Sequence, residues 1–288
     1  MSMYKIRNIA ILGAGTMGSG IAQIAAAAGF TVYMRDISKS FLNRGLARIK
    51  RSVEKILQKG LIRISKEEIL EKVIPVVSIK QIPQDDIDFV IEAIPENFEL
   101  KSKTFQEIDQ YFSLEVPFAT NTSTIRITKL ASVTQRPDKF IGIHFFNPPP
   151  LMPLVEIIPG ELTSNHVLEL SKDFVMSLGK EPVILKRDVP GFVVNRILAA
   201  ALEEAYKLLH ENVASKEDID KAVKLGLKWP MGPFELSDFI GLDVVLAILE
   251  TLKLEVDERF TPPDILIERV KKGLLGRKSG VGFYNYQK

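Results

Sequence analysis

A glycine-rich turn near the start of the chain limits what this sequence can fold into more than any other feature. Gly13-Ala-Gly15-Thr-Met-Gly18 follows a short apolar run, Asn8 to Leu12, without a gap. An Ala/Ile-rich segment then runs to about Gly29, and a second apolar run leads to Asp36. A strand, a glycine turn, a helix and an acidic residue about twenty positions downstream form the pattern of a dinucleotide-binding site.

The positions within the turn have separate physical roles. Gly13 permits the tight bend, Gly15 lets a diphosphate approach the backbone, and Gly18 allows the helix to pack closely on the strand. The helix N-terminus, at Thr16 and Met17, offers unpaired N–H groups to phosphate oxygens. The other interpretation is an ordinary strand, turn and helix that bind no ligand.

Asp36 indicates which dinucleotide the turn would hold. We expect its carboxylate to accept hydrogen bonds from both adenosine ribose hydroxyls and to repel a 2′-phosphate. The predicted cofactor is therefore NAD rather than NADP. The neighbouring Arg35 weakens that preference.

Apolar runs and helical segments continue to alternate as far as residue 187. The further runs are 73–77, 88–91, 118–119 and 140–143. This order predicts an α/β protein with a doubly wound, Rossmann-type, mostly parallel sheet. Every later segment has a helical pattern, beginning with a helix for which Asp188 is the expected N-cap. We expect residues 1–187 to form the dinucleotide domain, with a helical excursion at about 38–72, and residues 188–288 to form a smaller all-α domain.

Three polar segments, 92–97, 121–124 and 144–147, follow strand-like runs. Ligands of doubly wound sheets bind beyond the carboxyl ends of the strands, so these segments should lie at one rim. His144 is one of only three histidines, and prolines follow it closely. We expect these prolines to restrict a loop that carries His144 away from the sheet. An imidazole there is suited to proton transfer, although a buried histidine with a structural role is the alternative.

A basic stripe marks the helical excursion. Arg44, Arg48, Lys55 and Lys59 recur at helical spacings, and Ser52 lies on the same face. One interpretation is a solvated charged face. The other is a cradle for a phosphorylated part of a substrate.

Asn195 is a polar residue on the apolar stripe of the first helix of the second domain. A buried amide must find a partner or it costs stability. It either braces backbone or belongs to the site.

Composition excludes several classes of protein. A net charge of +2 over 288 residues gives no reason to expect nucleic acid or an anionic membrane as a partner. The absence of cysteine excludes disulfides, a thiolate nucleophile and a Cys-ligated metal, and no acidic cluster has the spacing of metal ligands. No apolar run is long enough to span a membrane, and the first strand begins too early to leave room for a signal peptide, so we expect a cytoplasmic protein.

Seven motifs occur in order along the chain: GAGTMGSGIA, EAIPEN, NTST, HFFNPPPLMPLVEI, DVPGFVVNR, KWPMGPFELSDFIGLD and GRKSGVGFYNY. Together they resemble the L-3-hydroxyacyl-CoA dehydrogenase family, which includes the 3-hydroxybutyryl-CoA dehydrogenases. The resemblance covers essentially the whole chain and is to the monofunctional form. It implies an NAD-dependent enzyme and a homodimer whose helical domain also contributes to substrate binding.

The resemblance also implies roles for individual residues. His144 matches the catalytic base, Glu156 matches the carboxylate that orients it, and Ser123 and Asn195 match polar groups around the substrate. The positions that match cofactor or coenzyme A contacts are Gly13, Gly15, Gly18 and Asp36 for the dinucleotide, Glu96, Lys101, Asn147 and Lys278 for the nicotinamide end, and Ser52 and Lys59 for coenzyme A.

The expected reaction is the reversible oxidation of an L-3-hydroxyacyl-CoA, such as 3-hydroxybutyryl-CoA, to the 3-oxoacyl-CoA. The family commonly has Val-Pro-Val-Met-Lys after the histidine segment, whereas this chain has Pro149-Pro-Leu-Met-Pro153, which leaves the acyl-chain preference open. One alternative is a dehydrogenase of a free hydroxy acid on the same scaffold. Another is a catalytically silent dinucleotide-binding protein.

Overall fold

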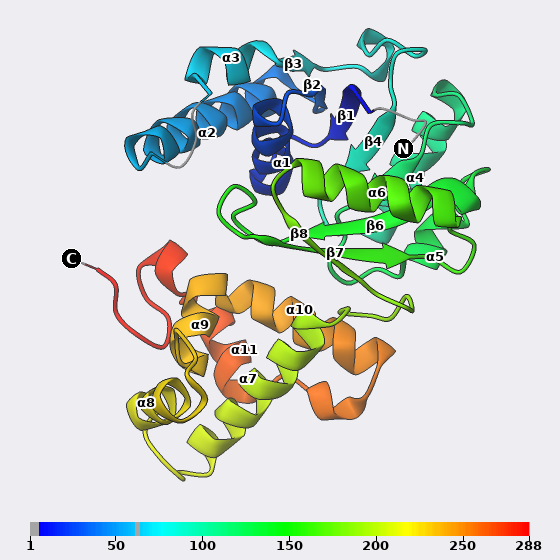
Figure 1. The fold of residues 1–288 in the computed structure, drawn as a ribbon. Coiled ribbons are helices and arrows are strands. Elements are labelled where there is room, and N and C mark those ends of the chain that lie inside the picture. The colour runs from blue at the N-terminus through cyan, green and yellow to red at the C-terminus, as the bar shows by residue number, and fades with distance from the viewer. Residues whose placement is uncertain (1–5, 61–63, 288) are drawn as a thin grey trace. The chain divides into compact units, whose positions relative to one another are not determined.

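The structure is a computed structural model that describes residues 6–60 and 64–287 (Figure 1). Residues 1–5, which the sequence predicts to lead directly into the first strand, lie outside the described residues. So do residues 61–63, which belong to the predicted helical excursion. The chain forms two compact units that divide between Val189 and Pro190, and each unit is described by itself.

The first unit is built on one eight-stranded sheet in the order β3-β2-β1-β4-β5-β6-β7-β8. The strands are β1 Asn8–Leu12, β2 Thr31–Arg35, β3 Val73–Val76, β4 Phe89–Glu92, β5 Phe118–Thr120, β6 Phe140–Phe145, β7 Leu154–Pro159 and β8 Glu181–Ile184. The first six are parallel, β7 is antiparallel to β6, and β8 is parallel to β7. The prediction of a doubly wound, mostly parallel sheet is confirmed.

Strands β7 and β8 are absent from the sequence-based prediction. A short chain reversal joins β6 to β7, so the alternation of strand and helix that identifies the other strands fails there. Strand β8 is the edge of the sheet and is largely exposed, so it lacks a continuous buried apolar run.

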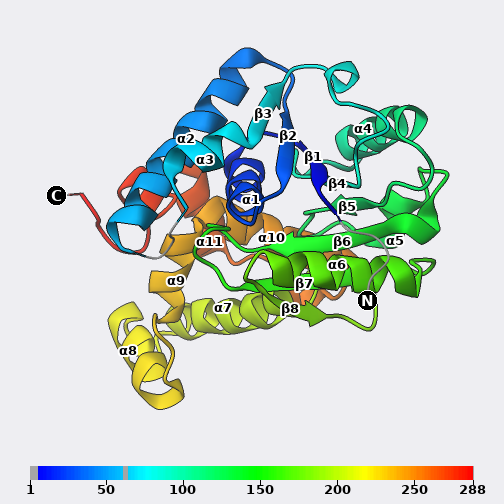
Figure 2. The same cartoon turned by 45° about the horizontal axis from the view of Figure 1, so that its top comes forward.

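Helices cover both faces of the sheet. They are α1 Thr16–Ala27, α2 Lys39–Gln58, α3 Lys66–Glu71, α4 Phe98–Tyr111, α5 Ile127–Ala131 and α6 Asn165–Ser177, with short 3-10 turns at Ile79–Gln81 and Pro137–Lys139. Helices α1, α2 and α3 contact one another (Figure 2) and share one apolar cluster with α6. On the other face, Phe105 of α4 contacts Phe118 of β5 and Phe140 of β6.

Helix α2 has the amphipathic pattern predicted from the sequence. Ser38 accepts a hydrogen bond from the Phe41 N–H and so caps its N-terminus. The apolar face is buried at Leu42, Ile49, Val53 and Ile56, whereas Leu46 at its border is only partly buried. At Gly45 an added Cβ would lie 2.9 Å from the Ala14 carbonyl oxygen, so α2 packs closely on the glycine turn.

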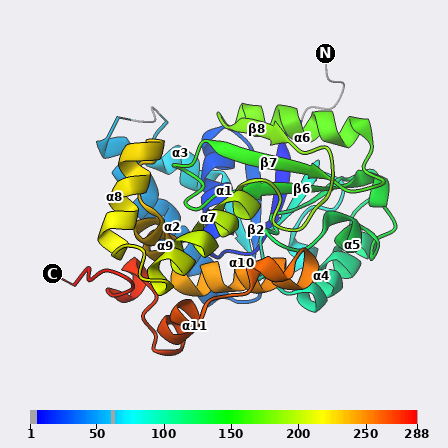
Figure 3. The ribbon, with the colours of Figure 1, turned by 90° about the horizontal axis from the view of Figure 1, so that it is seen from below.

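The second unit is helical, as predicted. Its helices are α7 Val194–His210, α8 Lys216–Leu227, α9 Pro233–Ile240, α10 Leu242–Glu255 and α11 Asp264–Lys271, with 3-10 turns at Glu258–Phe260 and Arg277–Ser279. Helix α7 contacts α9 and α10 (Figure 3), and the rings of Tyr206, Phe234 and Phe283 pack together in the core.

The predicted start of α7 is wrong. Asp188 does not cap it, because its carboxylate accepts a hydrogen bond from the Thr128 N–H at 2.8 Å in the first unit. Gly191 (φ 72°) and Phe192 (φ 50°) adopt left-handed backbone conformations, which interrupt the helix before Val194.

Arg136 terminates α4 from within the core. Its guanidinium is 1% exposed and lies 2.6 Å from a carboxylate oxygen of Asp109. It also donates to four backbone carbonyls at the end of α4 and just beyond it, those of Asp109, Phe112, Ser113 and Val116. The cation therefore satisfies carbonyls that a helix C-terminus leaves unpaired.

We expect Arg136→Met to lower the free energy of unfolding by about 3–5 kcal/mol, because it leaves the buried Asp109 carboxylate without its cation. Urea titration of the two proteins measures the difference. Lys139→Met breaks a partly exposed ion pair with Glu115 and should cost less than about 1 kcal/mol. Equal losses in the two variants would contradict this account.

Candidate active site

The glycine turn has the geometry that the sequence predicts. Gly13 has a φ of 110°, and a Cβ there would lie 2.5 Å from the Ala93 carbonyl oxygen. A Cβ on Gly18 would lie 1.9 Å from the Gly13 carbonyl oxygen. Beside Gly15, by contrast, no protein atom lies within 4 Å of an added Cβ. Two of the glycines are therefore required by packing within the protein, and the third borders open space.

That open space lies at the N-terminus of α1. Gly15 is the N-cap residue and supplies no side-chain cap, and the exposed Thr16 begins the first turn, with Met17 after it. Asp36 is held beside the turn, since Oδ2 accepts from the Ala14 N–H at 2.8 Å and Oδ1 from the Ile37 N–H at 2.7 Å. A carboxylate has about four acceptor positions, so Asp36 retains capacity for two further donors.

His144 and Glu156 meet across two strands. His144 lies within β6, directly opposite Glu156 of β7 in the antiparallel register. The Nδ1 atom of His144 is 2.8 Å from Oε2 of Glu156, and the two residues are 6% and 0% exposed. The expectation that a proline-restricted loop carries His144 is wrong, because the ladder between β6 and β7 positions it. Asn147 lies beyond the strand and is exposed.

Glu96 organises the loop that contains Ser123. Its Oε1 atom accepts from the Thr122 hydroxyl at 2.6 Å, the Ser123 N–H at 2.9 Å and the Thr124 hydroxyl at 2.8 Å. Burial alone raises the pKa of Glu96, but the charge of Lys101 and the hydrogen bonds from Thr122 and Thr124 outweigh it, so the net shift is downward. An ionised Glu96 thus fixes the loop at the carboxyl end of β5.

Lys101 joins Glu96 to a second carboxylate, Glu92. The Lys101 ammonium lies 2.6 Å from Oε1 of Glu92 and 3.3 Å from Oε2 of Glu96. Complete burial raises the pKa of Glu92, and Lys101 and the Thr120 hydroxyl offset part of that shift. The sequence-based prediction includes Glu92 only within a rim segment and omits Thr120. The available signal was a carboxylate at the end of a wholly buried apolar strand.

The remaining predicted residues lie elsewhere. Ser52 is half-buried on α2, and Lys59 is the exposed residue that ends that helix. Asn195, which is 8% exposed on α7, and Lys278, which pairs with Asp243, belong to the helical unit and are described only within it. The structure therefore brings together His144 with Glu156, and Ser123 with Glu96 and Lys101.

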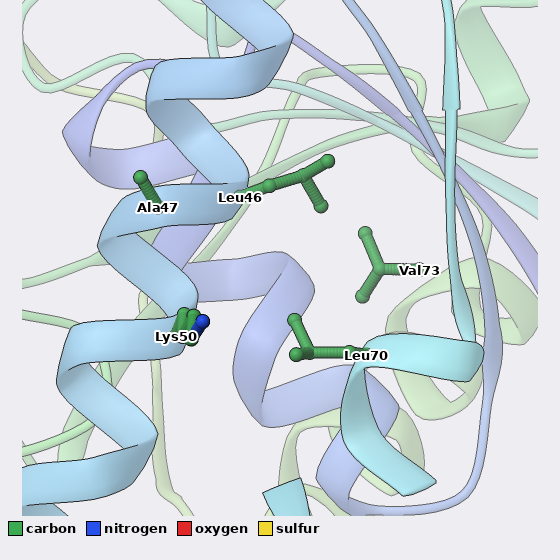
Figure 4. A pocket seen from close by; sticks show the side chains of 5 residues that line it. All are labelled: Leu46, Ala47, Lys50, Leu70 and Val73. Atoms are coloured by element: carbon green, nitrogen blue, oxygen red, sulfur yellow. The ribbon is translucent and has the colours of Figure 1, made fainter. Parts of the chain in front are cut away.

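Two hollows of the first unit lie away from these residues. One, of about 300 Å³, is lined by Leu46, Ala47, Lys50, Leu70 and Val73 between α2, α3 and β3 (Figure 4). It flanks the buried face of α2 on the side opposite the basic stripe, as the helical spacing of these residues requires. The other, of about 500 Å³, lies at the amino ends of β4, β5 and β6. Neither is at the carboxyl rim, where polar groups converge.

Within residues 6–60 and 64–287, no group of His, Asp and Glu side chains has the arrangement of a metal site. None of the helices described is both long and apolar enough to cross a membrane.

Comparison with known proteins identifies the family. Residues 8–189 match the model for the 3-hydroxyacyl-CoA dehydrogenase NAD binding domain, and residues 191–286 match the C-terminal domain of the same family. The chain belongs to the 3-hydroxyacyl-CoA dehydrogenase family. It is an NAD-dependent oxidoreductase, so the predicted family, enzyme class and cofactor are confirmed.

Individual relatives agree over nearly the full length. The chain is 44% identical over 277 residues to a probable 3-hydroxybutyryl-CoA dehydrogenase from Deinococcus radiodurans, covering 96% of this chain and 99% of the relative. It is 43% identical over 284 residues to a 3-hydroxybutyryl-CoA dehydrogenase from Bradyrhizobium diazoefficiens, covering 98% and 96%. The crystal structure of (S)-3-hydroxybutyryl-CoA dehydrogenase from Ralstonia eutropha superimposes with a TM-score of 0.92 at 43% identity, covering 99% and 100%.

Gly18 and Gly15 should respond differently to alanine. Gly18→Ala forces backbone apart and should cost about 1–3 kcal/mol of stability, as overpacking does. Gly15→Ala meets no protein atom and should cost less than about 1 kcal/mol. Because its methyl group enters the space open to the diphosphate, NADH affinity should still fall by about tenfold or more. Thermal unfolding and NADH fluorescence titration measure the two effects, and full NADH affinity in Gly15→Ala would show that the dinucleotide does not approach this turn.

Proposed function

We propose that this chain catalyses the reversible, NAD-dependent oxidation of L-3-hydroxyacyl-CoA thioesters, such as 3-hydroxybutyryl-CoA, to 3-oxoacyl-CoA. The observation that carries the proposal is the 2.8 Å contact between His144 and Glu156 at the carboxyl end of the sheet that holds the glycine turn. The names of the bacterial relatives support the substrate class.

His144 would act as the general base. Glu156 accepts the hydrogen bond at Nδ1, which leaves Nε2 as the ring nitrogen that takes the proton from the substrate hydroxyl. The carboxylate then stabilises the imidazolium as it forms. In the reverse direction His144 returns the proton to the carbonyl oxygen. NAD, when bound, would accept the hydride that leaves the carbon atom bearing the substrate hydroxyl.

Ser123 would position the substrate oxygen against His144, and Asn195 of the helical unit would contribute an amide to substrate binding. The loop that carries Ser123 is fixed by Glu96, and Asn195 is a buried residue of α7. Groups held in a productive geometry in this way contribute a large part of enzymatic rate.

NAD would lie across the glycine turn at the N-terminus of α1. Thr16 and Met17 would present N–H groups to the diphosphate, and Asp36 would accept both ribose hydroxyls with the capacity it retains. Glu96, Lys101 and Asn147 would surround the nicotinamide end, and Lys278 of the helical unit would contribute to cofactor binding. The residues present in the first unit fit this cofactor, because the space beside Gly15 is open.

The basic stripe of α2 would bind the phosphates of coenzyme A. Among the described residues, no carboxylate forms an ion pair with Arg44, Arg48, Lys55 or Lys59, so its charge is not neutralised locally. Ser52 lies on the same face and adds a hydroxyl donor. This charge favours a coenzyme A thioester over a free hydroxy acid.

The two units would have different functions. The first would bind NAD, and the helical unit would contribute to substrate binding and to a homodimer interface. Exposed apolar side chains on that unit, including Ile197, Leu225 and Leu227, are suited to a subunit interface. We also propose that the enzyme acts in the cytoplasm.

His144→Gln should lower kcat for L-3-hydroxybutyryl-CoA oxidation by about 10²–10⁴-fold, the range of general acid–base catalysis. NADH absorbance measures the rate. His210→Gln, which changes an exposed histidine at the end of α7, is the matched control and should retain full activity. Robust turnover in His144→Gln would remove this residue from the mechanism. If the wild-type protein binds NAD but oxidises neither thioester nor free acid, a catalytically silent dinucleotide-binding protein becomes the better account.

Lys59→Met should raise KM for 3-hydroxybutyryl-CoA by about five- to tenfold, because it removes one charge-assisted contact to phosphate. KM for the corresponding pantetheine thioester, which lacks the adenosine phosphates, should not change. Lys50→Met is the control, since Lys50 lies on the opposite flank of α2 beside the hollow of Figure 4. Equal turnover of the free hydroxy acid and the thioester in the wild type would favour a free-acid dehydrogenase instead.

A further inference from the structure

A buried ion pair joins Glu92 to Lys101, and its carboxylate, Glu92, has no role in the chemistry described above. Glu92 is the last residue of β4, and Lys101 lies near the start of α4. Their side chains are 0% and 1% exposed, and the ammonium lies 2.6 Å from Oε1 of the carboxylate. Burial of such a pair is costly, and apolar residues of similar volume often serve a core equally well. A contribution to the stability of the core is therefore not enough to explain why a charged pair occupies this position.

The Lys101 ammonium is fixed from three directions. It lies 2.6 Å from Glu92 Oε1, 3.3 Å from the Ile94 carbonyl oxygen and 3.3 Å from Glu96 Oε2. The contacts with Glu92 and with the Ile94 carbonyl are hydrogen bonds, and the contact with Glu96 is an ion pair. Glu92 supplies the closest of the three contacts.

Glu92 is itself fixed by the sheet and by the chain that follows it. It lies directly beside Thr120 in the register of β4 with β5, and the Thr120 hydroxyl donates to its Oε2 at 2.6 Å. The Ile94 N–H donates to its Oε1 at 2.7 Å. The carboxylate is thus held by β5 and by the chain just after β4, in addition to its contact with Lys101.

We propose that Glu92 is a positioning residue for the dehydrogenase. Its carboxylate holds Lys101, the ammonium holds Glu96, and Glu96 holds the segment Thr122–Thr124 that contains Ser123. The chain of contacts runs from a buried strand end to the groups assigned to the nicotinamide and the substrate oxygen. This inference rests on the proposed function for the roles of Lys101, Glu96 and Ser123.

The register of the sheet places this network on the face that carries the base. Glu92, Thr120 and Gly142 are direct neighbours across β4, β5 and β6, and His144 lies two residues beyond Gly142. Side chains two apart in a strand project to the same face. The positioning network and the pair of His144 with Glu156 therefore share one face near one end of the sheet.

Glu92→Gln tests the proposal, because glutamine keeps the shape and removes the charge. We expect the Kd for NADH to rise about tenfold and kcat/KM to fall by at least as much, since a small misplacement at a reacting centre costs up to about 10²-fold. The matched control is Asp109→Asn, which neutralises a buried carboxylate of α4 that also lies 2.6 Å from its cation, Arg136, outside the network. Asp109→Asn should lower the unfolding temperature yet leave NADH affinity within about twofold of the wild type, the ordinary result for a change away from a site.

Lys101→Met tests whether the effect passes through the ammonium. If it does, the double variant Glu92→Gln/Lys101→Met should bind NADH as tightly as Lys101→Met alone. In a protein that already lacks the Lys101 ammonium, Glu92 has no cation to position, so its replacement should have no further effect on NADH affinity. Losses that multiply in the double variant would overturn that route. A Kd for Glu92→Gln within about twofold of the wild type would overturn the proposal as a whole.

Thr120→Val decides the matter if Glu92→Gln does not fold. Valine suits a strand and removes a hydroxyl that donates to Glu92 at 2.6 Å and accepts from the Thr122 N–H at 3.2 Å, so both contacts of the network at this position are lost. We expect a folded protein whose Kd for NADH rises about threefold. Unchanged affinity in this variant would contradict the inference. NADH titration needs no acyl substrate, so a protein that binds NADH as described but oxidises no 3-hydroxyacyl-CoA would refute the proposed function and leave the role of Glu92 in cofactor binding standing.

Discussion

The pairing of His144 with Glu156 depends on a reversal of strand direction. In a wholly parallel sheet, neighbouring strands are separated by long crossovers, and a carboxylate twelve residues after the histidine would not lie beside it. Here β7 returns antiparallel to β6, and the register places the two residues directly opposite each other. The strand pair therefore supplies a preorganised base that no loop has to hold. The remainder of the sheet brings the glycine turn and the Glu96 loop to the same carboxyl rim.

The buried carboxylates at this rim each have a hydrogen-bonding partner. The His144–Glu156 contact and the Glu92–Lys101–Glu96 network each keep a carboxylate close to a hydrogen-bonding partner, so neither burial leaves a charge unpaired. Their hydrogen bonds tie ends of strands to segments that carry the site residues. By contrast, the equally buried Arg136 serves backbone carbonyls at the end of a helix. The same chemistry thus stabilises the fold at one end of α4 and organises the site at the other.

Much of this could be predicted from the sequence because local patterns determine it. The turn from Gly13 to Gly18 has a geometry that only glycine allows at its packed positions, and strand-helix alternation indicates a doubly wound sheet. The hairpin of β6 and β7 could not be predicted in this way, because its register depends on pairing between strands. For the same reason the sequence-based prediction attributed the placement of His144 to the prolines that follow it, whereas the pairing of β6 with β7 positions this residue. The Glu92–Lys101 pair was missed because contact between a strand end and a helix is a tertiary property.

Nitrogen NMR of the histidine rings tests the central claim most directly. The chain has three histidines, and the signals lost in His144→Gln identify those of His144. If Glu156 accepts from Nδ1, the neutral ring must carry its proton on Nδ1 and leave Nε2 as the basic nitrogen. We predict that tautomer at a pH where the ring is neutral. A neutral His144 protonated on Nε2 would contradict the account, because the nitrogen assigned to the substrate would then have no lone pair to accept its proton.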